Sequence, residues 1–333
     1  MNIGIIGCGG IAAVHARSIE NTDKNRLAAV ADCVYDKAQK MAQAYGAHAY
    51  EDWETMINQE ALDVVHLCTP HYLHTDMAVS CLKHGIHVFT EKPPVISRAQ
   101  LEQLQRAYIK AKDAEGLRLC VCFQNRWNPD VQFVKNTLLK KELGNITGIR
   151  GIVSWCRGTG YYSDQWHGKK ALEGGGALIN QGIHTLDLMQ YFVDEAAIRT
   201  EAVLDNLHLK GQIEVEDTLC AYIRYPDLTA NLYVTTGYTS DMSPLIDICC
   251  ENGHIRLENG EVIIRRGQDK PELHTFESEE LYGKSYWGAG HQKAISHFYR
   301  SIAEGTGNLL DFENVSETVD LMLRIYEAAE PKT

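Results

Sequence analysis

The stretch Ile3-Gly4-Ile5-Ile6-Gly7-Cys8-Gly9-Gly10-Ile11-Ala12, near the start of the chain, decides the fold. A short apolar run leads into a glycine-rich turn, and this order predicts a strand, a tight turn and then a helix. Gly7 permits the turn, Gly9 lets the backbone approach a phosphate, and the small Ala12 replaces a third glycine. The helix N-terminus adds unpaired N–H groups and the positive end of its dipole. The pattern therefore predicts a cradle for a dinucleotide pyrophosphate.

A second apolar run, Leu27-Ala28-Ala29-Val30-Ala31, ends at Asp32, about where an acid that binds the adenosine ribose is expected. A carboxylate accepts hydrogen bonds from the ribose hydroxyls and repels a 2′-phosphate. Because Cys33-Val34-Tyr35 follows and supplies no arginine, the sequence favours NAD over NADP. The alternative is that Asp32 only caps a loop.

Composition restricts the class of protein. The chain has 333 residues, of which 44% are hydrophobic, and its 32 basic and 44 acidic residues give a net charge of −12. This length suits two domains, and the acidic balance argues against a nucleic-acid partner. No apolar run approaches membrane-spanning length, and the N-terminus enters the first strand directly, so we expect neither a membrane segment nor a signal peptide. The ten cysteines form no Cys-x-x-Cys pair, which indicates reduced thiols in a cytoplasmic protein.

Strands and helices alternate over the first 120 or so residues. The expected strands continue with 63–68, 87–90 and 117–123, and the expected helices include one from a capping-box-like Asp36 to about Gly46. Two further helices are expected, one over 73–84 and one capped by Ser97-x-x-Gln100. Repeated units of this length predict a parallel, doubly wound Rossmann sheet.

After residue 123 the expected strands follow one another, at 148–156, 202–209, 219–225, 230–236, 246–250, 254–257 and 262–265. Turn signals separate them, including Asn259-Gly260, which is typical of a hairpin. We therefore predict an α/β protein with an NAD-binding Rossmann domain over 1–122 and an α+β domain over 123–333. The second domain has a largely antiparallel open sheet for substrate binding and oligomerisation.

Two segments carry candidate chemistry. Glu91-Lys92-Pro93 ends a Rossmann strand, where ligands of such sheets bind, and Lys92 could donate to a substrate hydroxyl and stabilise an alkoxide. The run Gly174-Gly175-Gly176 precedes a predicted helix whose Asn180 and His184 share a face four residues apart, with Asp187 placed to orient His184. Histidine titrates near neutral pH and suits proton transfer from an alcohol. The alternatives are a surface lysine and a structural histidine.

The glycine turn, Asp32, Thr69-Pro70, Glu91-Lys92-Pro93 and the triple-glycine helix resemble, in this order, the glucose–fructose oxidoreductase, inositol dehydrogenase and rhizopine-catabolism (Gfo/Idh/MocA) family. The resemblance spans the whole chain, including Gly290-His291 and Asp311-Phe312-Glu313. It implies an NAD(P)-dependent oxidoreductase acting on sugars, polyols or their derivatives, with Lys92 as active-site lysine and His184 as catalytic acid/base. The family's usual residue at position 180 is Asp; Asn180 cannot relay a proton, so that duty falls to His184.

The remaining candidates concern binding. The polar and aromatic stretches 124–129 and 161–170 suit a sugar pocket, or else are a surface loop. The pair His71-x-x-His74 suggests a metal, but a helix start explains it better, and we expect no metal site. The expected substrate contacts are Lys92, Arg126, Trp127, Tyr162, Trp166, Asn180 and His184. The expected cofactor contacts are Gly7, Gly9, Gly10, Ile11, Ala12, Asp32, Thr69, Pro70, His74, Glu91 and Lys92.

Three functions remain open at this stage. The first is a dehydrogenase that uses NAD on a carbohydrate held between the domains, in a homodimer or homotetramer. The second is a glycoside-cleaving enzyme that retains NAD and oxidises its sugar only transiently. The third is a non-catalytic sensor of a sugar or nucleotide on the same scaffold.

Overall fold

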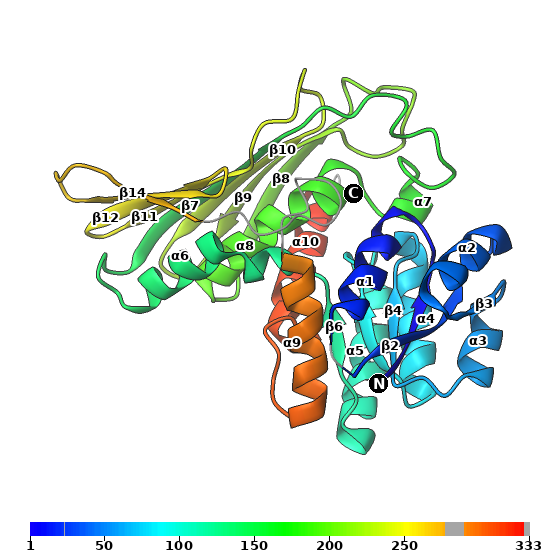
Figure 1. Ribbon diagram of the computed structural model, residues 1–333. Coiled ribbons are helices and arrows are strands. Elements are labelled where there is room, and N and C mark those ends of the chain that lie inside the picture. The colour runs from blue at the N-terminus through cyan, green and yellow to red at the C-terminus, as the bar shows by residue number, and fades with distance from the viewer. Residues whose placement is uncertain (23, 277–289, 330–333) are drawn as a thin grey trace. The chain divides into compact units, whose positions relative to one another are not determined.

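The computed structural model describes residues 1–22, 24–276 and 290–329 (Figure 1). The chain forms two compact units, Met1–Gln124 with Glu279–Ser316 (unit 1) and Asn125–Ser278 with Glu317–Thr333 (unit 2). This division differs from the predicted domains, 1–122 and 123–333, because helix α9 (Gly290–Glu304) returns to unit 1. Helix α10 (Phe312–Ala329) begins in unit 1 and continues in unit 2.

Unit 1 is built on a six-stranded parallel sheet with the order β3-β2-β1-β4-β5-β6, which confirms the predicted Rossmann fold. Strand β4 is buried along its whole length, as is typical of a parallel sheet covered on both faces. The strands are β1 (Asn2–Ile6), β2 (Arg26–Ala31), β3 (His48–Tyr50), β4 (Val64–Leu67), β5 (His87–Thr90) and β6 (Leu119–Val121). The helices are α1 (Gly10–Glu20), α2 (Tyr35–Tyr45), α3 (Trp53–Gln59), α4 (His71–Lys83) and α5 (Arg98–Glu115), with α9 packed against α1.

Local signals predicted some helix ends and missed others. The Ser97 side chain accepts a hydrogen bond from the Gln100 N–H, which confirms that cap. Gly46 ends α2 in the left-handed conformation, as predicted. The capping box at Asp36 is wrong, because α2 begins one residue earlier and Val34 provides no side-chain cap. Strand β3 and helix α3 were not predicted.

Unit 2 contains an eight-stranded sheet with the order β14-β13-β12-β11-β7-β10-β9-β8. The predicted, largely antiparallel arrangement is confirmed; the pair β7 and β10 is parallel. The strands are β7 (Ile146–Ser154), β8 (Arg199–Asp205), β9 (Thr218–Arg224), β10 (Thr229–Thr235), β11 (Leu245–Cys250), β12 (Gly253–Glu258), β13 (Glu261–Arg266) and β14 (Glu272–Thr275). Of these described strands, β14 alone was not predicted. The other elements are the 3₁₀ turn η1 (Gln124–Trp127), α6 (Pro129–Leu139), α7 (Lys170–Glu173), the π-helical turn η2 (Leu178–Gly182) and α8 (Ile183–Val193).

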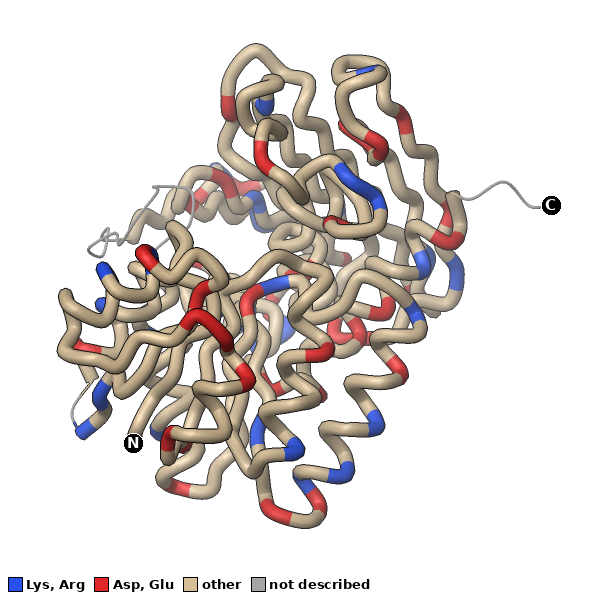
Figure 2. Tube along the Cα trace, turned by 90° about the vertical axis from the view of Figure 1, so that its right-hand side faces the viewer, with Lys and Arg blue, Asp and Glu red and all other residues tan. Residues whose placement is uncertain are grey.

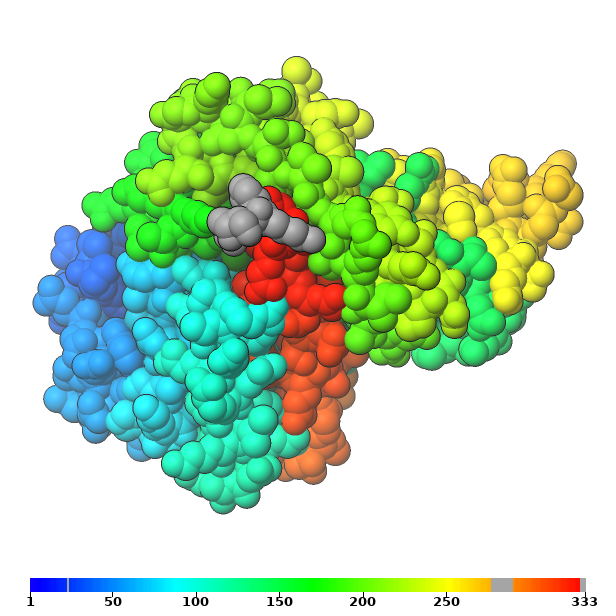
Figure 3. Space-filling model, turned by 180° about the vertical axis from the view of Figure 1, so that it is seen from behind, coloured from blue at the N-terminus to red at the C-terminus, as the bar shows by residue number. Residues whose placement is uncertain are grey.

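Helices α6 and α8 cover one face of this sheet (Figure 1). Gly151 of β7 permits the close approach of α8, because a Cβ there would lie 2.5 Å from the Met189 sulfur. Side chains of β8 and β9 alternate between more and less buried, and the outer positions include Val203 and Tyr222. The segment from β8 to β10 reaches the surface seen in Figure 3, where it is yellow-green. The sheet therefore keeps one covered face and one open face.

Two surface properties follow from the described residues. Lys and Arg are interspersed with Asp and Glu along the trace in Figure 2, so that view shows no continuous basic band among them. Within the same residues, no helix carries an apolar stretch long enough to cross a bilayer.

Candidate functional site

The turn between β1 and α1 requires glycine and leaves space beside it. Gly7 has a φ of +91°, and a Cβ at this position would lie 2.6 Å from the Cys68 carbonyl oxygen. By contrast, a Cβ at Gly9 or Gly10 would meet no other part of the chain within 4 Å among the described residues. Helix α1 starts at Gly10 with no side-chain cap, so its first N–H groups are available to an anion. The turn fits a dinucleotide pyrophosphate.

Asp32 lies half-buried beside this turn. Its Oδ2 accepts a hydrogen bond from the Cys8 N–H at 2.8 Å, and its Oδ1 accepts one from the Val34 N–H at 2.8 Å. Because each carboxylate oxygen can accept a second bond, Asp32 can cap this loop and still bind ribose hydroxyls. The two alternatives drawn from the sequence are therefore compatible.

His74 of α4 joins the loops that follow β4 and β5. Its Nδ1 lies 2.7 Å from the Pro93 carbonyl oxygen and its Nε2 lies 2.8 Å from the Thr69 carbonyl oxygen. The side chain is buried, and burial lowers its pKa. Since both ring nitrogens face backbone carbonyl oxygens, His74 positions these two loops, and its expected contact with the cofactor stays a prediction. Thr69, Pro70 and Lys92 of the same loops are half-buried.

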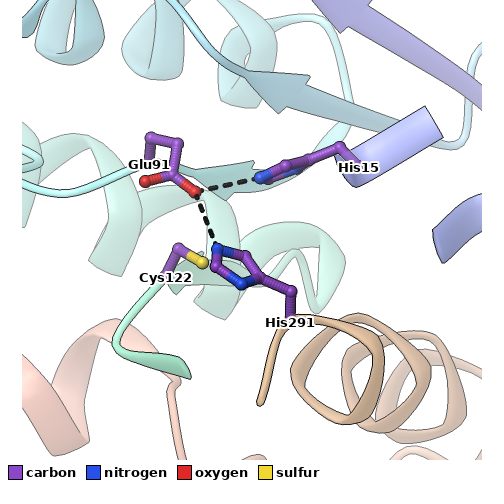
Figure 4. A group of neighbouring side chains, drawn as sticks. All are labelled: His15, Glu91, Cys122 and His291. Carbon is purple, nitrogen blue, oxygen red and sulfur yellow. Dashed lines mark hydrogen bonds and ion pairs between the residues drawn. The ribbon is translucent and has the colours of Figure 1, made fainter. Parts of the chain in front are cut away.

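Glu91 lies in a buried group of polar side chains with His15, Cys122 and His291, which we call the Glu91 cluster (Figure 4). The Glu91 Oε1 lies 2.9 Å from His15 Nε2 and 3.9 Å from His291 Nε2. Burial alone would raise the pKa of Glu91, but the hydrogen bond from His15 and the charges of its neighbours hold it well below the ordinary range. Burial lowers the pKa of His291 to about 4. Glu91 is therefore a buried anion.

The ligand atoms of the Glu91 cluster lie within 4.8 Å of one another and include nitrogen, oxygen and sulfur. A tetrahedral zinc ion bound at about 2.0 Å would hold neighbouring nitrogen and oxygen ligands about 3.3 Å apart. The 2.9 Å separation of His15 Nε2 and Glu91 Oε1 is instead a hydrogen bond. Burial also raises the pKa of the Cys122 thiol, which opposes the thiolate that a metal needs. We interpret the group as a hydrogen-bonded cluster.

The sequence analysis did not predict the roles of His15 and His66 in this region. His15 follows Ala12 by three residues, on the buried face of α1. His66 interrupts the fully buried strand β4. A polar side chain in either place requires a partner, and that requirement is the signal that could have drawn attention to both.

In unit 2, Asn180 and His184 are both half-buried at the start of α8. Asn180 lies in the π-helical turn η2, so the predicted regular α-helical spacing to His184 is wrong. The Asn180 Nδ2 donates to the Tyr161 hydroxyl at 3.0 Å and to Glu173 Oε1 at 2.6 Å. Asn180 is thus paired with a carboxylate that is itself only 1% exposed.

The triple-glycine segment approaches other parts of unit 2. A Cβ at Gly175 would lie 2.1 Å from the Tyr326 hydroxyl, and one at Gly176 would lie 2.0 Å from the Glu216 carbonyl oxygen. The Glu216 carboxylate accepts hydrogen bonds from the N–H of Gly176 at 2.9 Å and of Leu178 at 3.0 Å. These glycines therefore fix the path of the chain into α8. The sequence analysis gave no role to Glu216, which lies 40 residues beyond Gly176.

Asp187 does not orient His184, contrary to the prediction. Its Oδ2 accepts from Arg126 Nε at 2.9 Å, and its Oδ1 accepts from Arg126 Nη2 at 2.7 Å and from the Thr318 hydroxyl at 2.9 Å. Arg126 is 2% exposed and Asp187 is 1% exposed. This buried, bidentate pair connects η1 to α8, so the expectation that Arg126 binds substrate is not supported by its position.

The aromatic candidates differ in their surroundings. The Tyr162 ring packs against a small apolar core of Leu209, Ile213 and Val215, and burial raises the pKa of Tyr162 to about 12. Trp166 stacks near His167, with 3.7 Å between ring centroids, and is half-buried, as is Trp127. Tyr162 is thus a packing residue, whereas Trp127 and Trp166 remain predicted sugar contacts.

Comparison with known proteins agrees with this geometry. Residues 1–116 match the NAD-binding Rossmann-fold model of the Gfo/Idh/MocA oxidoreductases, and residues 131–256 match a C-terminal domain model of the same family. The chain belongs to the Gfo/Idh/MocA oxidoreductase family. The family resemblance drawn from the sequence motifs is confirmed.

The sequence identity between this chain and individual relatives is about 30% or lower. The chain is 31% identical over 209 residues to D-glucoside 3-dehydrogenase of Escherichia coli, a match that covers 60% of this chain and 56% of that protein. It is 26% identical to levoglucosan dehydrogenase of Pseudarthrobacter phenanthrenivorans, over 92% of this chain and 90% of that one. A solved structure of the WlbA dehydrogenase from Bordetella pertussis, in complex with NADH and UDP-GlcNAcA, superposes with a TM-score of 0.85 at 26% identity, over 99% of this chain and 95% of that chain.

Proposed function

We propose that this protein is an NAD-dependent dehydrogenase that transfers a hydride between the nicotinamide and a hydroxyl-bearing carbon of a sugar, polyol or sugar derivative. The observation that carries the proposal is the glycine turn with Asp32 beside it, in a chain of this oxidoreductase family. The sugar class is supported by the names of the relatives, which include two dehydrogenases of glucosides or anhydrosugars.

Each residue of the proposed site has a separate role. The Gly7 turn binds the pyrophosphate through backbone N–H groups, and Asp32 binds the adenosine ribose and disfavours a 2′-phosphate. NAD held by these residues would supply nicotinamide C4 as the hydride acceptor. Lys92 donates a hydrogen bond to the substrate hydroxyl oxygen and stabilises negative charge that develops there. A ring nitrogen of His184 accepts the hydroxyl proton, so the substrate leaves as a carbonyl compound.

Asn180 has a supporting role in this scheme. Its Nδ2 donates to Glu173 and Tyr161, so a hydrogen bond between Asn180 and substrate would run through the amide carbonyl oxygen, which can only accept. We expect Asn180 to orient the sugar, with no part in proton transfer. The open face of the unit 2 sheet, with Val203 and Tyr222 on it, supports a homodimer or homotetramer.

The test is turnover of NAD with a panel of polyols, free sugars, glycosides and sugar nucleotides, followed by the absorbance of reduced nicotinamide. We expect a signal with one substrate class that falls at least about 100-fold in His184→Ala and in Lys92→Ala. His208→Ala is the matched control, since His208 is an exposed histidine of the same unit. Near-normal turnover in both active-site variants would refute the role assignment. Glycoside cleavage without net reduction of NAD would instead identify the closed-cycle enzyme.

A further inference from the structure

The side-chain amide of Asn180 is held by two acceptors of unit 2. Its Nδ2 donates to Glu173 Oε1 at 2.6 Å and to the Tyr161 hydroxyl at 3.0 Å. An ionised carboxylate only accepts hydrogen bonds, so the amide atom beside Glu173 is the nitrogen and not the oxygen. Because the two acceptors take the two hydrogens of one planar amide, they also fix the direction in which its carbonyl oxygen, Oδ1, points.

Glu173 is itself fixed at the end of the short helix α7. It is 1% exposed, and its Oε2 accepts a hydrogen bond from the Gly168 N–H. Gly168 has a φ of +75°, and a Cβ there would lie 2.6 Å from Ile213 Cγ2, so the backbone that presents this N–H requires glycine. Both carboxylate oxygens of Glu173 therefore accept from N–H donors, an arrangement that suits an ionised carboxylate in one orientation.

The Tyr161 hydroxyl is held by two successive residues of η2. Besides Asn180, the Gln181 Nε2 lies 3.2 Å from this hydroxyl, and Gln181 is 5% exposed. Successive side chains of a regular α-helix do not face the same way, whereas this π-helical turn places both amides on one oxygen. The Tyr161 ring also contacts the ring of His167, with 4.7 Å between centroids. Tyr161 is therefore a second fixed partner for the Asn180 amide.

The charge of Glu173 decides which atom of Asn180 faces away from α7. The Gly168 N–H and the Asn180 Nδ2 both donate to residue 173, and the first belongs to the backbone and cannot be reversed. In Glu173→Gln the new side chain has one acceptor and one donor, so its oxygen would face Gly168 and its nitrogen would face Asn180. The Asn180 amide would then turn over, with Oδ1 accepting from residue 173 and from the Tyr161 hydroxyl.

We propose that Glu173 and Tyr161 are positioning residues that fix the Asn180 amide with its carbonyl oxygen toward the substrate. Position 180 is then an uncharged acceptor. It selects a substrate hydroxyl, which can donate, and disfavours an ether oxygen, a carbonyl oxygen or a carboxylate in the same place, because each of these would leave two acceptors facing one another. This selectivity rests on the proposed function. The orientation of the amide does not, because it can be measured without a substrate.

The first experiment follows the Asn180 amide itself by NMR. The full-length protein is labelled with nitrogen-15 on asparagine, and exchange of the side-chain amide hydrogens with water is measured. The exposed Asn136 of α6 is the internal reference, and the variants Asn180→Ala and Asn136→Ala identify the two signals. We expect exchange at Asn180 to be at least about 10-fold slower than at Asn136, and to become about 10-fold faster in Glu173→Gln, because a hydrogen bond to a charged acceptor is lost.

Two tyrosine variants separate positioning from general stability. Tyr161→Phe removes one of the two acceptors, so we expect a smaller increase in the exchange rate at Asn180. Tyr225→Phe is the matched control, because the Tyr225 hydroxyl is buried and donates to the Gln190 amide of α8 at 2.9 Å. We expect no change in exchange at Asn180 from this control. Thermal unfolding identifies any variant that fails to fold, and Tyr161→Phe decides the question if Glu173→Gln does not fold.

The second experiment measures the selectivity. It uses the sugar that the substrate panel identifies, with its monodeoxy and monodeoxyfluoro analogues, in which fluorine cannot donate a hydrogen bond. We expect the wild type to reject the analogue altered at the hydroxyl that faces Asn180, and this discrimination in kcat/KM to fall at least about 10-fold in Glu173→Gln. The Kd for NAD should not change. Asn180→Asp combined with Glu173→Gln again presents an acceptor at position 180, so it should restore the discrimination.

The outcomes are distinguishable. Exchange at Asn180 as fast as at Asn136 in the wild type, or unchanged exchange in a folded Glu173→Gln variant, would overturn the positioning of the amide, whatever the activity. Faster exchange in Glu173→Gln with unchanged discrimination among the analogues would overturn the role in selectivity. The expected exchange rates in a protein that turns over no panel substrate would support the fixed amide and refute the proposed function.

Discussion

Replacing Asn180 with aspartate should make the stability of the protein depend on pH. The Asn180 Nδ2 lies 2.6 Å from Glu173 Oε1, so Asn180→Asp would place two carboxylate oxygens about this far apart. Two full charges at that distance repel by about 6 kcal/mol at an effective dielectric constant of about 20. Keeping one proton on the pair at pH 7 costs less, about 4 kcal/mol for a carboxyl with an ordinary pKa near 4.3. The pair should therefore retain a proton, and a shared hydrogen bond recovers part of the cost, so we expect a loss of about 2–4 kcal/mol at pH 7.

The sign of the pH dependence follows from proton counting. The folded variant binds one proton more than the unfolded chain at pH values between the unfolded pKa, near 4, and the raised folded pKa. Its free energy of unfolding, relative to wild type, should fall by about 1.4 kcal/mol per pH unit across that window. Urea unfolding between pH 4.5 and 8 measures this slope.

Two control variants sharpen the result. Asn180→Ala loses the hydrogen bond without adding a carboxylate, so its deficit should not grow with pH in this way. Asn180→Asp combined with Glu173→Gln restores an amide–carboxylate pair and should recover most of the lost stability. A pH-independent deficit in Asn180→Asp, or no recovery in the double variant, would show that Glu173 and residue 180 do not share this contact.

Three further predictions concern single contacts. Arg126→Met should lower the free energy of unfolding by about 3–5 kcal/mol, because it leaves Asp187 charged and buried. Urea unfolding measures this loss, and we expect the KM for substrate of the folded variant to stay unchanged. Gly7→Ala should weaken NAD binding, measured by calorimetry, and lower the free energy of unfolding by about 1–3 kcal/mol, because the φ of +91° and the nearby Cys68 carbonyl oxygen oppose a Cβ. An unchanged affinity for NAD would contradict the role of the turn. Asp32→Asn should weaken NAD binding about 10- to 100-fold, because it removes a charged acceptor for the ribose hydroxyls. The ratio of kcat/KM for NAD to that for NADP should also fall, and an unchanged ratio would show that Asp32 does not select the cofactor.

The sequence predicted those parts of the fold that depend on local chemistry. Gly7 is required by its own backbone conformation and by one close neighbour, so a short motif was sufficient to identify the turn. Most Rossmann strands appeared as apolar runs, because they are buried on both faces. Strand β3 has only three residues, and none of them is fully buried, so it produced no such run.

The errors at the site have a common physical cause. The sequence analysis paired Asp187 with its helix neighbour His184, yet its partner, Arg126, lies 61 residues away in the chain. Spacing along a helix specifies which side chains share a face, but a buried carboxylate is paired with whichever donor the tertiary fold brings to it. The same reasoning applies to His66, whose partners His15 and Tyr299 come from opposite ends of the chain. A buried polar residue in an apolar strand therefore predicts that a partner exists, and only the assembled fold identifies it.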